Sequence, residues 1–401
     1  MGRISPSYEH KIDKMKQSIE EVDVKGKRVL MRVDFNVPLS NGKITDDRRI
    51  LMALPSINSV LNRGGSLTLM SHLGRPSGNG FEQEYSLEPV AKRLSELLGK
   101  PVSFSDDDTN SEIVLLENLR FNQGEKDGDE RFAEKLASKG DIYCNDAFGT
   151  AHRNHASMVA VPMAMSGKPR VSGLLLSKEL KYLEHAITNA QKPFVAVLGG
   201  AKVSDKLCAI KNLLGRVDTI LIGGAMAYTF LIASGKDVGS SLVEKDRVKD
   251  AESILDLAQS SSTELLLPVD HVCAQKIEQG TPVKIFTDSI QDSWIGLDIG
   301  PETIKSYSNK LKSAKTIVWN GPMGVFELNQ FDDGTHQIAD AIALASENGA
   351  ISIIGGGDSA AAVSKFNLDS QMTHISTGGG ASIQMLEGIQ FNSVNILDDT
   401  L

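Results

Sequence analysis

The chain has 401 residues, of which 41% are hydrophobic and 23% are charged. This length is long for one hydrophobic core and indicates two domains, and the composition shows no sign of disorder. The formal net charge of −9 argues against a nucleic-acid binder, so an anion site would have to be a local concentration of positive charge.

The cysteines and the apolar runs indicate the compartment. Three widely spaced cysteines form neither a disulfide framework nor a CxxC metal pattern, which fits a reducing environment. The first twenty residues hold no signal-peptide core, and no apolar run approaches the roughly 18 residues of a membrane span. We therefore expect a cytoplasmic protein without a membrane partner.

Short apolar runs typical of strands alternate with amphipathic segments along the chain. The expected strands are 28–34, 66–71, 112–116, 141–144, 193–198, 217–222, 264–267, 315–319, 350–354 and 373–376. The clearest helical patterns lie at 87–98, 130–139, 244–259 and 335–348. This alternation predicts an α/β fold built from parallel sheets. A further helical segment without a motif, 173–190, is expected to connect a domain at 1–172 to one at 191–385.

The polar motifs differ in kind between the two halves. Before residue 160 they combine Arg, His, Asp and Asn: RVDFNVP at 32–38, SHLGRP at 71–76, ENLRF at 117–121 and NDAFGTAHRNH at 145–155. After residue 190 they combine glycine with isolated Lys and Asp: LGGAKVSDK at 198–206, IGGAM at 222–226, GGGDS at 355–359 and TGGGAS at 377–382. Nearly all follow a predicted strand, where parallel α/β sheets bind ligands. We expect phosphoryl transfer between an anion held by side-chain charge and phosphates held by backbone N–H groups.

The glycine motifs of the second half are open to more than one interpretation. GGGDSA loosely fits the dinucleotide fingerprint, but the acidic residue expected about 20 positions later is missing. Asp358 would repel a phosphate unless Mg²⁺ lay between them, which favours a metal–nucleotide loop over a structural turn with an N-capping Asp. In TGGGAS, three glycines let N–H groups converge on an anion, whereas a tight turn would usually need one.

Two lysines of the second half stand four residues apart. Lys202 and Lys206 are expected on one side of the start of a helix, where two positive charges are unfavourable in isolation. A bound polyphosphate would compensate this cost, and a solvated surface pair would not.

In the first half, Asp34 and Asn36 follow a strand and would suit a hydroxyl-bearing substrate. Singly, each nearby arginine is an ordinary surface residue. Together, four sites at strand ends indicate an anion pocket, since guanidinium binds phosphate and carboxylate bidentately: His72, Arg75, Arg120 and Arg153. A zinc site at His152 and His155 fits no strong template.

Nine motifs in order over about residues 26–390 make the chain resemble the phosphoglycerate kinase family: RVDFNVP, SHLGRP, ENLRF, NDAFGTAHR, LGGAKV, GLDIGP, VWNGPMGVFE, GGGDS and TGGGAS. The resemblance implies a monomeric glycolytic enzyme with two Rossmann-like domains facing each other across a hinged cleft. It also implies that the C-terminal tail, 386–401, packs back on the first domain. The implied reaction is reversible phosphoryl transfer between 1,3-bisphosphoglycerate and MgADP, giving 3-phosphoglycerate and MgATP, in line and after domain closure.

The resemblance also implies a role for each motif residue. The phosphoglycerate would be held by Asp34, Asn36, Arg49, His72, Arg75, Arg120 and Arg153. The nucleotide would be held by Lys206, Gly296, Glu327, Gly356, Gly357, Asp358 and Ser359, with Asp358 on Mg²⁺. The moving phosphoryl group would be stabilised by Arg49, Lys202, Gly378, Gly379 and Gly380. A carboxylate or phosphate nucleophile needs no deprotonation, so His72 is expected to bind substrate without relaying protons.

The chain departs from the family pattern at three places. Ser359 stands where Thr is more frequent, Gln384 stands where Glu is common, and roughly ten extra residues at the start are expected to be ragged and without a catalytic role. Two rival functions fit less well. A nicotinamide-dependent oxidoreductase would explain neither lysine, and an inactive binding protein would normally have lost one of Arg49, Lys202, Lys206 or Asp358.

Overall fold

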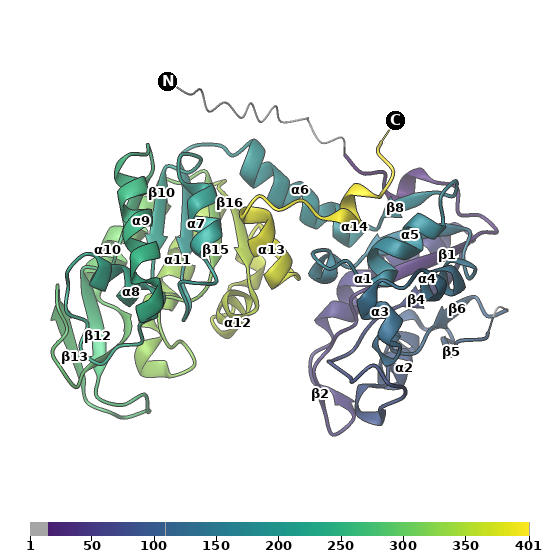
Figure 1. Cartoon of the computed structure of the whole chain (residues 1–401), viewed down its shortest axis with the longest axis horizontal. Helices are drawn as coiled ribbons and strands as arrows, with labels where there is room; N and C mark the ends of the chain where they lie inside the picture. Colours follow the sequence, from purple (N-terminus) through teal and green to yellow (C-terminus); the bar gives the residue numbers. More distant parts are fainter. Residues whose placement is uncertain (1–14, 109, 401) are drawn as a thin grey trace. The chain divides into compact units, whose positions relative to one another are not determined.

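The computed structural model describes residues 15–108 and 110–400, except for the side chains of 184–188. The chain forms two compact units (Figure 1). Unit 1 extends to Lys178 and includes the returning segment Gln390–Leu401, and unit 2 comprises Glu179–Ile389. The boundary lies inside helix α6 (Leu174–Thr188), in the segment expected to connect the domains. The expected ragged start falls on residues 1–14, outside the described residues.

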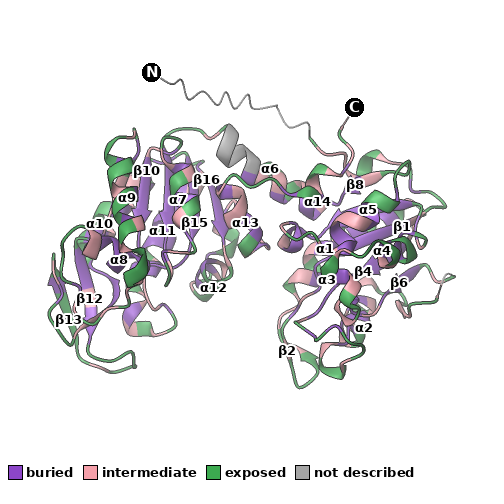
Figure 2. Cartoon of the chain, viewed as in Figure 1, coloured by how far each residue is buried: buried purple, intermediate pink, exposed green. Residues whose placement is uncertain are grey.

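Unit 1 is built on a six-stranded sheet in the order β5-β6-β4-β1-β7-β8, in which every pair is parallel. Its central strands are buried on both faces, as a parallel sheet between two helical layers requires (Figure 2). Its strands are β1 (Arg28–Val33), β4 (Ser66–Met70), β5 (Ser103–Phe104), β6 (Ile113–Leu115), β7 (Ile142–Asp146) and β8 (Arg170–Ser172), and a separate hairpin pairs β2 (Leu39–Ser40) with β3 (Lys43–Ile44).

The helices of unit 1 pack in two groups, α1 with α2, and α3 with α4 and α5. They are α1 (Arg48–Asn62), α2 (Glu88–Leu98), α3 (Gln123–Asp127), α4 (Glu130–Ala137), α5 (Val161–Ala164) and α14 (Asn392–Asn395). Shorter turns are η1 (Ile19–Glu21), η2 (Gln83–Tyr85), η3 (Leu119–Phe121), η4 (Phe148–Thr150) and the π-helical η5 (Ala156–Ala160). The helices predicted at 87–98 and 130–139 are confirmed as α2 and α4.

Helix α1 is absent from the sequence-based expectations although it has 15 residues. It contains Pro55, which is unfavourable inside a helix, and its N-cap residue Asp47 makes no side-chain capping hydrogen bond. Its apolar face, including Ile50, Ile57 and Val60, is buried in the core of unit 1. Tertiary packing therefore maintains this helix against its local sequence.

Unit 2 contains a second six-stranded parallel sheet, in the order β11-β10-β9-β15-β16-β17. Its strands are β9 (Phe194–Leu198), β10 (Thr219–Ile222), β11 (Glu264–Leu266), β15 (Thr316–Asn320), β16 (Ile351–Gly355) and β17 (His374–Ile375). Together, the two sheets confirm the predicted α/β class with parallel sheets.

The helices of unit 2 also form two groups, α7 with α8, α9 and α13, and α10 with α11 and α12. They are α7 (Leu207–Leu213), α8 (Met226–Ala233), α9 (Val248–Gln259), α10 (Pro301–Lys312), α11 (Asp333–Glu347), α12 (Gly357–Lys365) and α13 (Gly379–Leu386). Short 3₁₀ turns are η6 (Lys245–Arg247), η7 (Asn329–Phe331) and η8 (Asp369–Gln371). Within the described residues, no helix has the combination of length and apolar sequence that crossing a membrane requires.

A small antiparallel sheet in unit 2 was not anticipated. It has the order β13-β12-β14, with β12 (Asp270–Ala274), β13 (Val283–Thr287) and β14 (Ile295–Ile299). Strand β13 is exposed at four of its five positions, so it carries little of the apolar signal by which buried strands are recognised. The motif GLDIGP thus begins in an antiparallel strand, apart from the strands of the parallel sheet.

The last residues of the chain contact unit 1 through polar groups. The Asp398 carboxylate accepts hydrogen bonds from the backbone N–H and the guanidinium of Arg170, at 2.8 and 2.7 Å. The Ser393 hydroxyl donates to the Ala151 carbonyl at 2.5 Å. These contacts tie the segment after Gln390 to β8 and to the loop that follows β7.

Candidate functional site

Asp34 and Arg49 lie in contact at the end of β1. Asp34 follows β1 directly, is 8% exposed, and accepts a hydrogen bond at Oδ2 from Nη1 of Arg49, the second residue of α1. Gly149 passes so close that a Cβ atom there would lie 2.3 Å from Asp34 Oδ2. A side chain at position 149 would therefore displace the carboxylate.

Two predicted residues hold the loop that carries His72. The Asn36 side-chain oxygen accepts a hydrogen bond from the Gly74 N–H at 2.8 Å, and Arg120 Nη1 donates to the Gly74 carbonyl at 2.7 Å. Gly74 has a φ of 61°, a conformation that favours glycine. Asn36 and Arg120 thus hold the N–H and the carbonyl of Gly74, two residues after His72.

His72 is buried and neutral. Its Nδ1 lies 3.1 Å from Nη2 of Arg32, and because a guanidinium can only donate, Nδ1 must be the acceptor. Burial, with the positive charges of Arg32, Arg120 and Arg49, lowers the pKa of His72 well below its usual value. The 4.0 Å approach of Nδ1 to Asp34 Oδ1 is therefore no ion pair.

The cationic residues around His72 lack sufficient negative charge nearby. Burial, followed by the charge of Arg32, lowers the pKa of Arg120 to about 10, and its buried Nε has no hydrogen-bond partner among the described residues. Burial and the charge of Arg120 lower the pKa of His155 to about 4. A bound anion would relieve this repulsion. We call Arg32, Arg49, His72 and Arg120 the basic cluster.

The two remaining predicted residues of unit 1 lie differently. Arg153 is exposed, and its charge contributes to lowering the pKa values of His152 and His155, so it lies near the basic cluster. Arg75 is also exposed, and no contact described above includes it. One prediction needs correction: Arg120 does not end a strand, because β6 ends at Leu115 and Arg120 lies in η3.

In unit 2, Lys206 is buried against the end of β15. Its Nζ donates a hydrogen bond to the side-chain oxygen of Asn320, the last residue of that strand. Burial lowers the pKa of Lys206 to about 8, although the carboxylates of Asp205, Asp358 and Glu387 act in the opposite direction. The buried Asn320 Nδ2 has no hydrogen-bond partner within the described residues. The side chain thus offers a free donor beside the lysine.

The two glycine motifs meet beside Asn320. A Cβ at Gly379 would lie 3.1 Å from Gly356 Cα, and a Cβ at Gly356 would lie 3.3 Å from Asn320 Oδ1. Gly356 has a φ of 93° and is the N-cap of α12, whereas Gly378 is the N-cap of α13. The N-terminal ends of both helices therefore lie next to one strand end, an arrangement suited to phosphates.

Some groups of these motifs are already engaged. The Ser359 hydroxyl accepts a hydrogen bond from the Gly321 N–H at 2.6 Å, so this residue has a structural partner. The Gly378 N–H donates to the Ser376 hydroxyl at 3.2 Å. Asp358 and Gly357 are exposed in the first turn of α12. Asp358 therefore remains accessible to a ligand.

The expectation that Lys202 and Lys206 share the start of a helix is wrong. Helix α7 begins at Leu207, and the preceding residues form turns, with Lys206 as the N-cap residue. Lys202 is exposed whereas Lys206 is buried, so the two ammonium groups have different environments. The i, i+4 argument assumed a regular helix that the glycine-containing loop does not form.

Two predicted nucleotide residues lie apart from the Lys206–Asn320 contact. Gly296 lies in β14, where its N–H donates to the Ser241 hydroxyl at 2.9 Å and a Cβ would meet Tyr228 Oη at 2.1 Å. Glu327 is exposed, and no contact joins it to Lys206.

A metal ion in this protein would need coordination from a bound phosphate compound. The described residues include no group of three or more His, Cys, Asp or Glu side chains that could hold one. The exposed Asp358 carboxylate fits a Mg²⁺ ion whose other ligands are phosphate oxygens and water.

Comparison with known proteins identifies the family. Residues 19–389 match the phosphoglycerate kinase family. The phosphoglycerate kinase of Rhodopirellula baltica is 56% identical over 400 residues, covering 96% of this chain and 99% of its own length. That of Thermosipho africanus is 53% identical over 387 residues, covering 93% and 95%. The structure of phosphoglycerate kinase from Coxiella burnetii has a TM-score of 0.88 at 40% identity and covers 95% of this chain and 98% of its own.

The chain belongs to the phosphoglycerate kinase family. Members of this family are phosphotransferases of glycolysis, so the enzymatic function predicted from the motifs is confirmed at the level of the family. A solved phosphoglycerate kinase from Pyrococcus horikoshii OT3 has a TM-score of 0.80 at 33% identity and covers 95% and 98% of the two chains.

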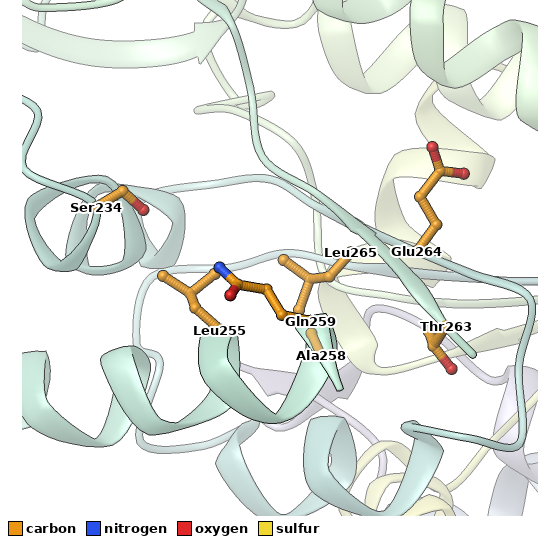
Figure 3. A pocket seen from close by; sticks show the side chains of 7 residues that line it. All are labelled: Ser234, Leu255, Ala258, Gln259, Thr263, Glu264 and Leu265. Atoms are coloured by element: carbon orange, nitrogen blue, oxygen red, sulfur yellow. The ribbon is translucent and has the colours of Figure 1, made fainter. Parts of the chain in front are cut away.

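A cavity of about 310 Å³ in this kinase lies away from the motif residues. Figure 3 shows its lining, which consists of Ser234, Leu255, Ala258, Gln259, Thr263, Glu264 and Leu265. Glu264 is the charged residue of this lining, and its carboxylate pairs with Lys310 at 2.5 Å. This cavity therefore offers no positive charge for a phosphate.

Sequence reasoning missed several residues of both sites. Asn320 stood inside the quoted motif VWNGP, where a polar residue at a strand end was a usable signal. Arg32 likewise stood in RVDFNVP. Glu125 and Glu387 carried no comparable signal, because only tertiary packing brings them to Arg32 and Lys206.

Proposed function

We propose that this chain catalyses reversible phosphoryl transfer between 1,3-bisphosphoglycerate and MgADP, giving 3-phosphoglycerate and MgATP. The observation that carries the proposal is the basic cluster around Asp34, in a chain whose net charge is −9. Such a concentration of buried and half-buried guanidinium groups is costly without an anionic ligand. A phosphoglycerate, with a carboxylate and a phosphate, supplies the missing negative charge.

The acid substrate is assigned to unit 1. We infer that Arg49, His72 and Arg120 of the basic cluster, with Asn36 and Arg153, bind its carboxylate and phosphate, while Asp34 accepts a hydrogen bond from its hydroxyl group. Arg75 is included because its guanidinium is exposed on the loop that carries His72. The neutral state of His72 supports a role in binding, since a neutral imidazole can donate one hydrogen bond without moving a proton.

The nucleotide is assigned to unit 2. We infer that Lys206 and the N-terminal ends of α12 and α13 hold its phosphates, with Gly356, Gly357, Gly379 and Gly380 allowing close approach. Asp358 would hold Mg²⁺, which when bound would neutralise charge on the phosphate oxygens. Roles for Gly296, Glu327 and Ser359 in nucleotide binding, and for Gly378 toward the moving phosphoryl group, are part of the same proposal and rest on the motif resemblance.

The transfer itself needs no general base. The nucleophile is a carboxylate oxygen in one direction and a phosphate oxygen in the other, so catalysis consists of positioning and charge stabilisation. We infer that Arg49 and Lys202 stabilise the phosphoryl group in transit. Because the two ligands are assigned to different units, transfer requires a conformation that brings the ligands in line and excludes water.

A coupled assay tests this function. The protein is incubated with 3-phosphoglycerate, MgATP, NADH and glyceraldehyde-phosphate dehydrogenase, and oxidation of NADH is followed. We expect oxidation that depends on both 3-phosphoglycerate and MgATP. A rate no higher than that of the blank would contradict the proposal.

Arg49→Ala tests the catalytic assignment. We expect kcat to fall by about 10²-fold or more because a positive charge near the transferred group is lost. The adjacent Arg48→Ala is the matched control: Arg48 lies on the same helix, but its guanidinium pairs with Asp46 at 2.6 Å. A near-normal kcat for Arg49→Ala, or an equal loss in both variants, would reject the role of Arg49.

Further expectations about the molecule belong to this proposal. We propose a cytoplasmic monomer that binds small molecules and no nucleic acid, on the strength of its acidic charge and three free cysteines. The domain limits expected from the sequence, 1–172 and 191–385, with a tail from 386, are proposed as functional limits, although the compact units are divided at Lys178 and Ile389.

A further inference from the structure

Two buried residues that no motif singled out extend the basic cluster into the core of unit 1. They are Ser157, in the π-helical turn η5, and Glu125, in α3, and both are 0% exposed. The Arg32 guanidinium, also 0% exposed, reaches Ser157 with Nε and His72 with Nη2. The buried side chains of Glu125, Ser157, Arg32 and His72 are therefore linked in sequence by hydrogen bonds, which we call the hydrogen-bond chain.

The direction of each hydrogen bond in the hydrogen-bond chain follows from which groups can only donate. Arg32 Nε can only donate, so the Ser157 hydroxyl, 2.8 Å away, accepts with its oxygen. The single hydroxyl proton of Ser157 is then available for Glu125 Oε1, at 2.7 Å, and the Ser157 N–H donates to Glu125 Oε2 at 2.9 Å. Both carboxylate oxygens of Glu125 are thus engaged by one residue.

At the other end of the hydrogen-bond chain, Arg32 determines the tautomer of His72. Arg32 Nη2 donates to Nδ1, so the ring proton must be on Nε2. In the opposite tautomer, the proton on His72 Nδ1 would point at a proton on Arg32 Nη2. His72 therefore has Nε2–H as its one donor.

Electrostatics also requires a partner for Arg32. A fully buried guanidinium is costly unless a negative charge compensates it. Burial raises the pKa of Glu125, and the nearby charge of Arg32 acts against this rise by stabilising the carboxylate. The Ser157 hydroxyl lies between the two charges, so removing it breaks the hydrogen-bonded link between Arg32 and its counter-charge.

We propose that Glu125 and Ser157 are positioning residues that orient Arg32 and thereby hold His72 as the Nε2–H tautomer toward the phosphoglycerate. This inference rests on the proposed function for the identity of the ligand. The tautomer of His72 itself does not depend on that function and can be measured without turnover.

The experiment compares Ser157→Ala with Ser157→Thr, which retains the hydroxyl, in the full-length protein. We expect Ser157→Ala to raise the KM for 3-phosphoglycerate about tenfold, as loss of a hydrogen bond to a charged group does, and to leave the KM for MgATP within about twofold. Ser157→Thr should restore most of the wild-type KM. Nitrogen-15 NMR of labelled histidine, assigned with His72→Gln, should show Nε2–H alone in the wild type and a mixture of tautomers in Ser157→Ala.

Two further variants keep the result decisive. Glu125→Gln removes the counter-charge and one acceptor of Ser157, so it should shift both readouts as Ser157→Ala does. Ser56→Ala is the matched control, because Ser56 is a fully buried hydroxyl of the same unit whose hydrogen bonds go to the Leu174 N–H, at 2.9 Å, and to Asp146, neither of which belongs to the basic cluster. It should change neither the KM values nor the His72 tautomer.

The outcomes are distinct. An unchanged His72 tautomer with an unchanged KM for 3-phosphoglycerate, in either folded variant, overturns the proposal. An equal rise of both KM values, shared with Ser56→Ala, also overturns it, because a general loss of structure would explain the effect. If the wild type shows no turnover, the proposed function fails, and the NMR signal still decides whether Glu125 and Ser157 determine the tautomer.

Discussion

Lys206 is a residue whose chemistry depends on its burial. An ammonium group in water keeps its proton far above neutral pH, but burial beside Asn320 lowers the pKa of Lys206 to about 8. The positive charge proposed to hold phosphate is therefore present below pH 8 and is lost in the free enzyme as pH rises through that value. Phosphate binding at the Lys206–Asn320 contact is therefore expected to depend on pH.

We expect kcat/KM for MgATP to fall above about pH 8, since this parameter reports the pKa values of the free enzyme. In Lys206→Arg the charge persists to a much higher pH, so the inflection should disappear even if the rate itself is lower. Initial rates at saturating 3-phosphoglycerate between pH 6 and 10, on the order of one point per half unit, measure this. An inflection near pH 8 that persists in Lys206→Arg would assign it to another group.

At the scale of elements, the loop between β16 and α12 depends on one glycine more than on its neighbour. Gly356 has a φ of 93°, which side chains rarely adopt, and a Cβ there would also approach Asn320 at 3.3 Å. Gly357 is the first residue of α12, has an ordinary φ, and has open space around its Cβ position. The two positions differ in backbone conformation and not in sequence character.

Gly356→Ala should therefore lower the free energy of unfolding by about 1–3 kcal/mol, the usual cost of a strained backbone conformation. Gly357→Ala should be neutral or stabilising by at most about 1 kcal/mol, because alanine favours a helix over glycine. Urea unfolding of the full-length protein, followed by circular dichroism, compares the two. Equal destabilisation by both substitutions would show that the φ of Gly356 is not the cause.

For the whole molecule, buried neutral histidines make stability depend on pH in both units. His72 and His155 in unit 1 and His271 in unit 2 have pKa values lowered chiefly by burial, to about 4 for His155 and His271. The unfolded chain binds these protons near pH 6.5, so stability is complete above that value and is lost as pH falls toward 4. Asp146 acts in the opposite sense: burial raises its pKa to about 6, so its contribution decreases as pH rises toward that value.

His271→Phe isolates one of these contributions. The His271 ring is 1% exposed and lies against Tyr228 with centroids 5.5 Å apart, and neither ring nitrogen has a hydrogen-bond partner among the described residues. Phenylalanine would preserve the packing without a titrating group. Between pH 8 and pH 5, the free energy of unfolding of the variant should fall by about 2 kcal/mol less than that of the wild type. Urea unfolding at both pH values measures this. An identical pH dependence would mean that His271 does not titrate as we infer.

The sequence by itself determined the α/β class and most strands of the two parallel sheets, but not the short strands β5 and β8. Apolar runs are local signals, so all ten expected strands occur, whereas the assignment of Asp34, His72 and Lys206 to ligand binding stays a prediction. Only the tertiary structure decided which of these polar groups meet. Arg32 and Ser157 are 125 positions apart, and no local pattern relates them. Tertiary packing also decided that α1 is helical, because its buried apolar face compensates for Pro55. Periodicity reports which side of an element is buried, whereas hydrogen bonds between buried polar groups depend on how distant elements pack.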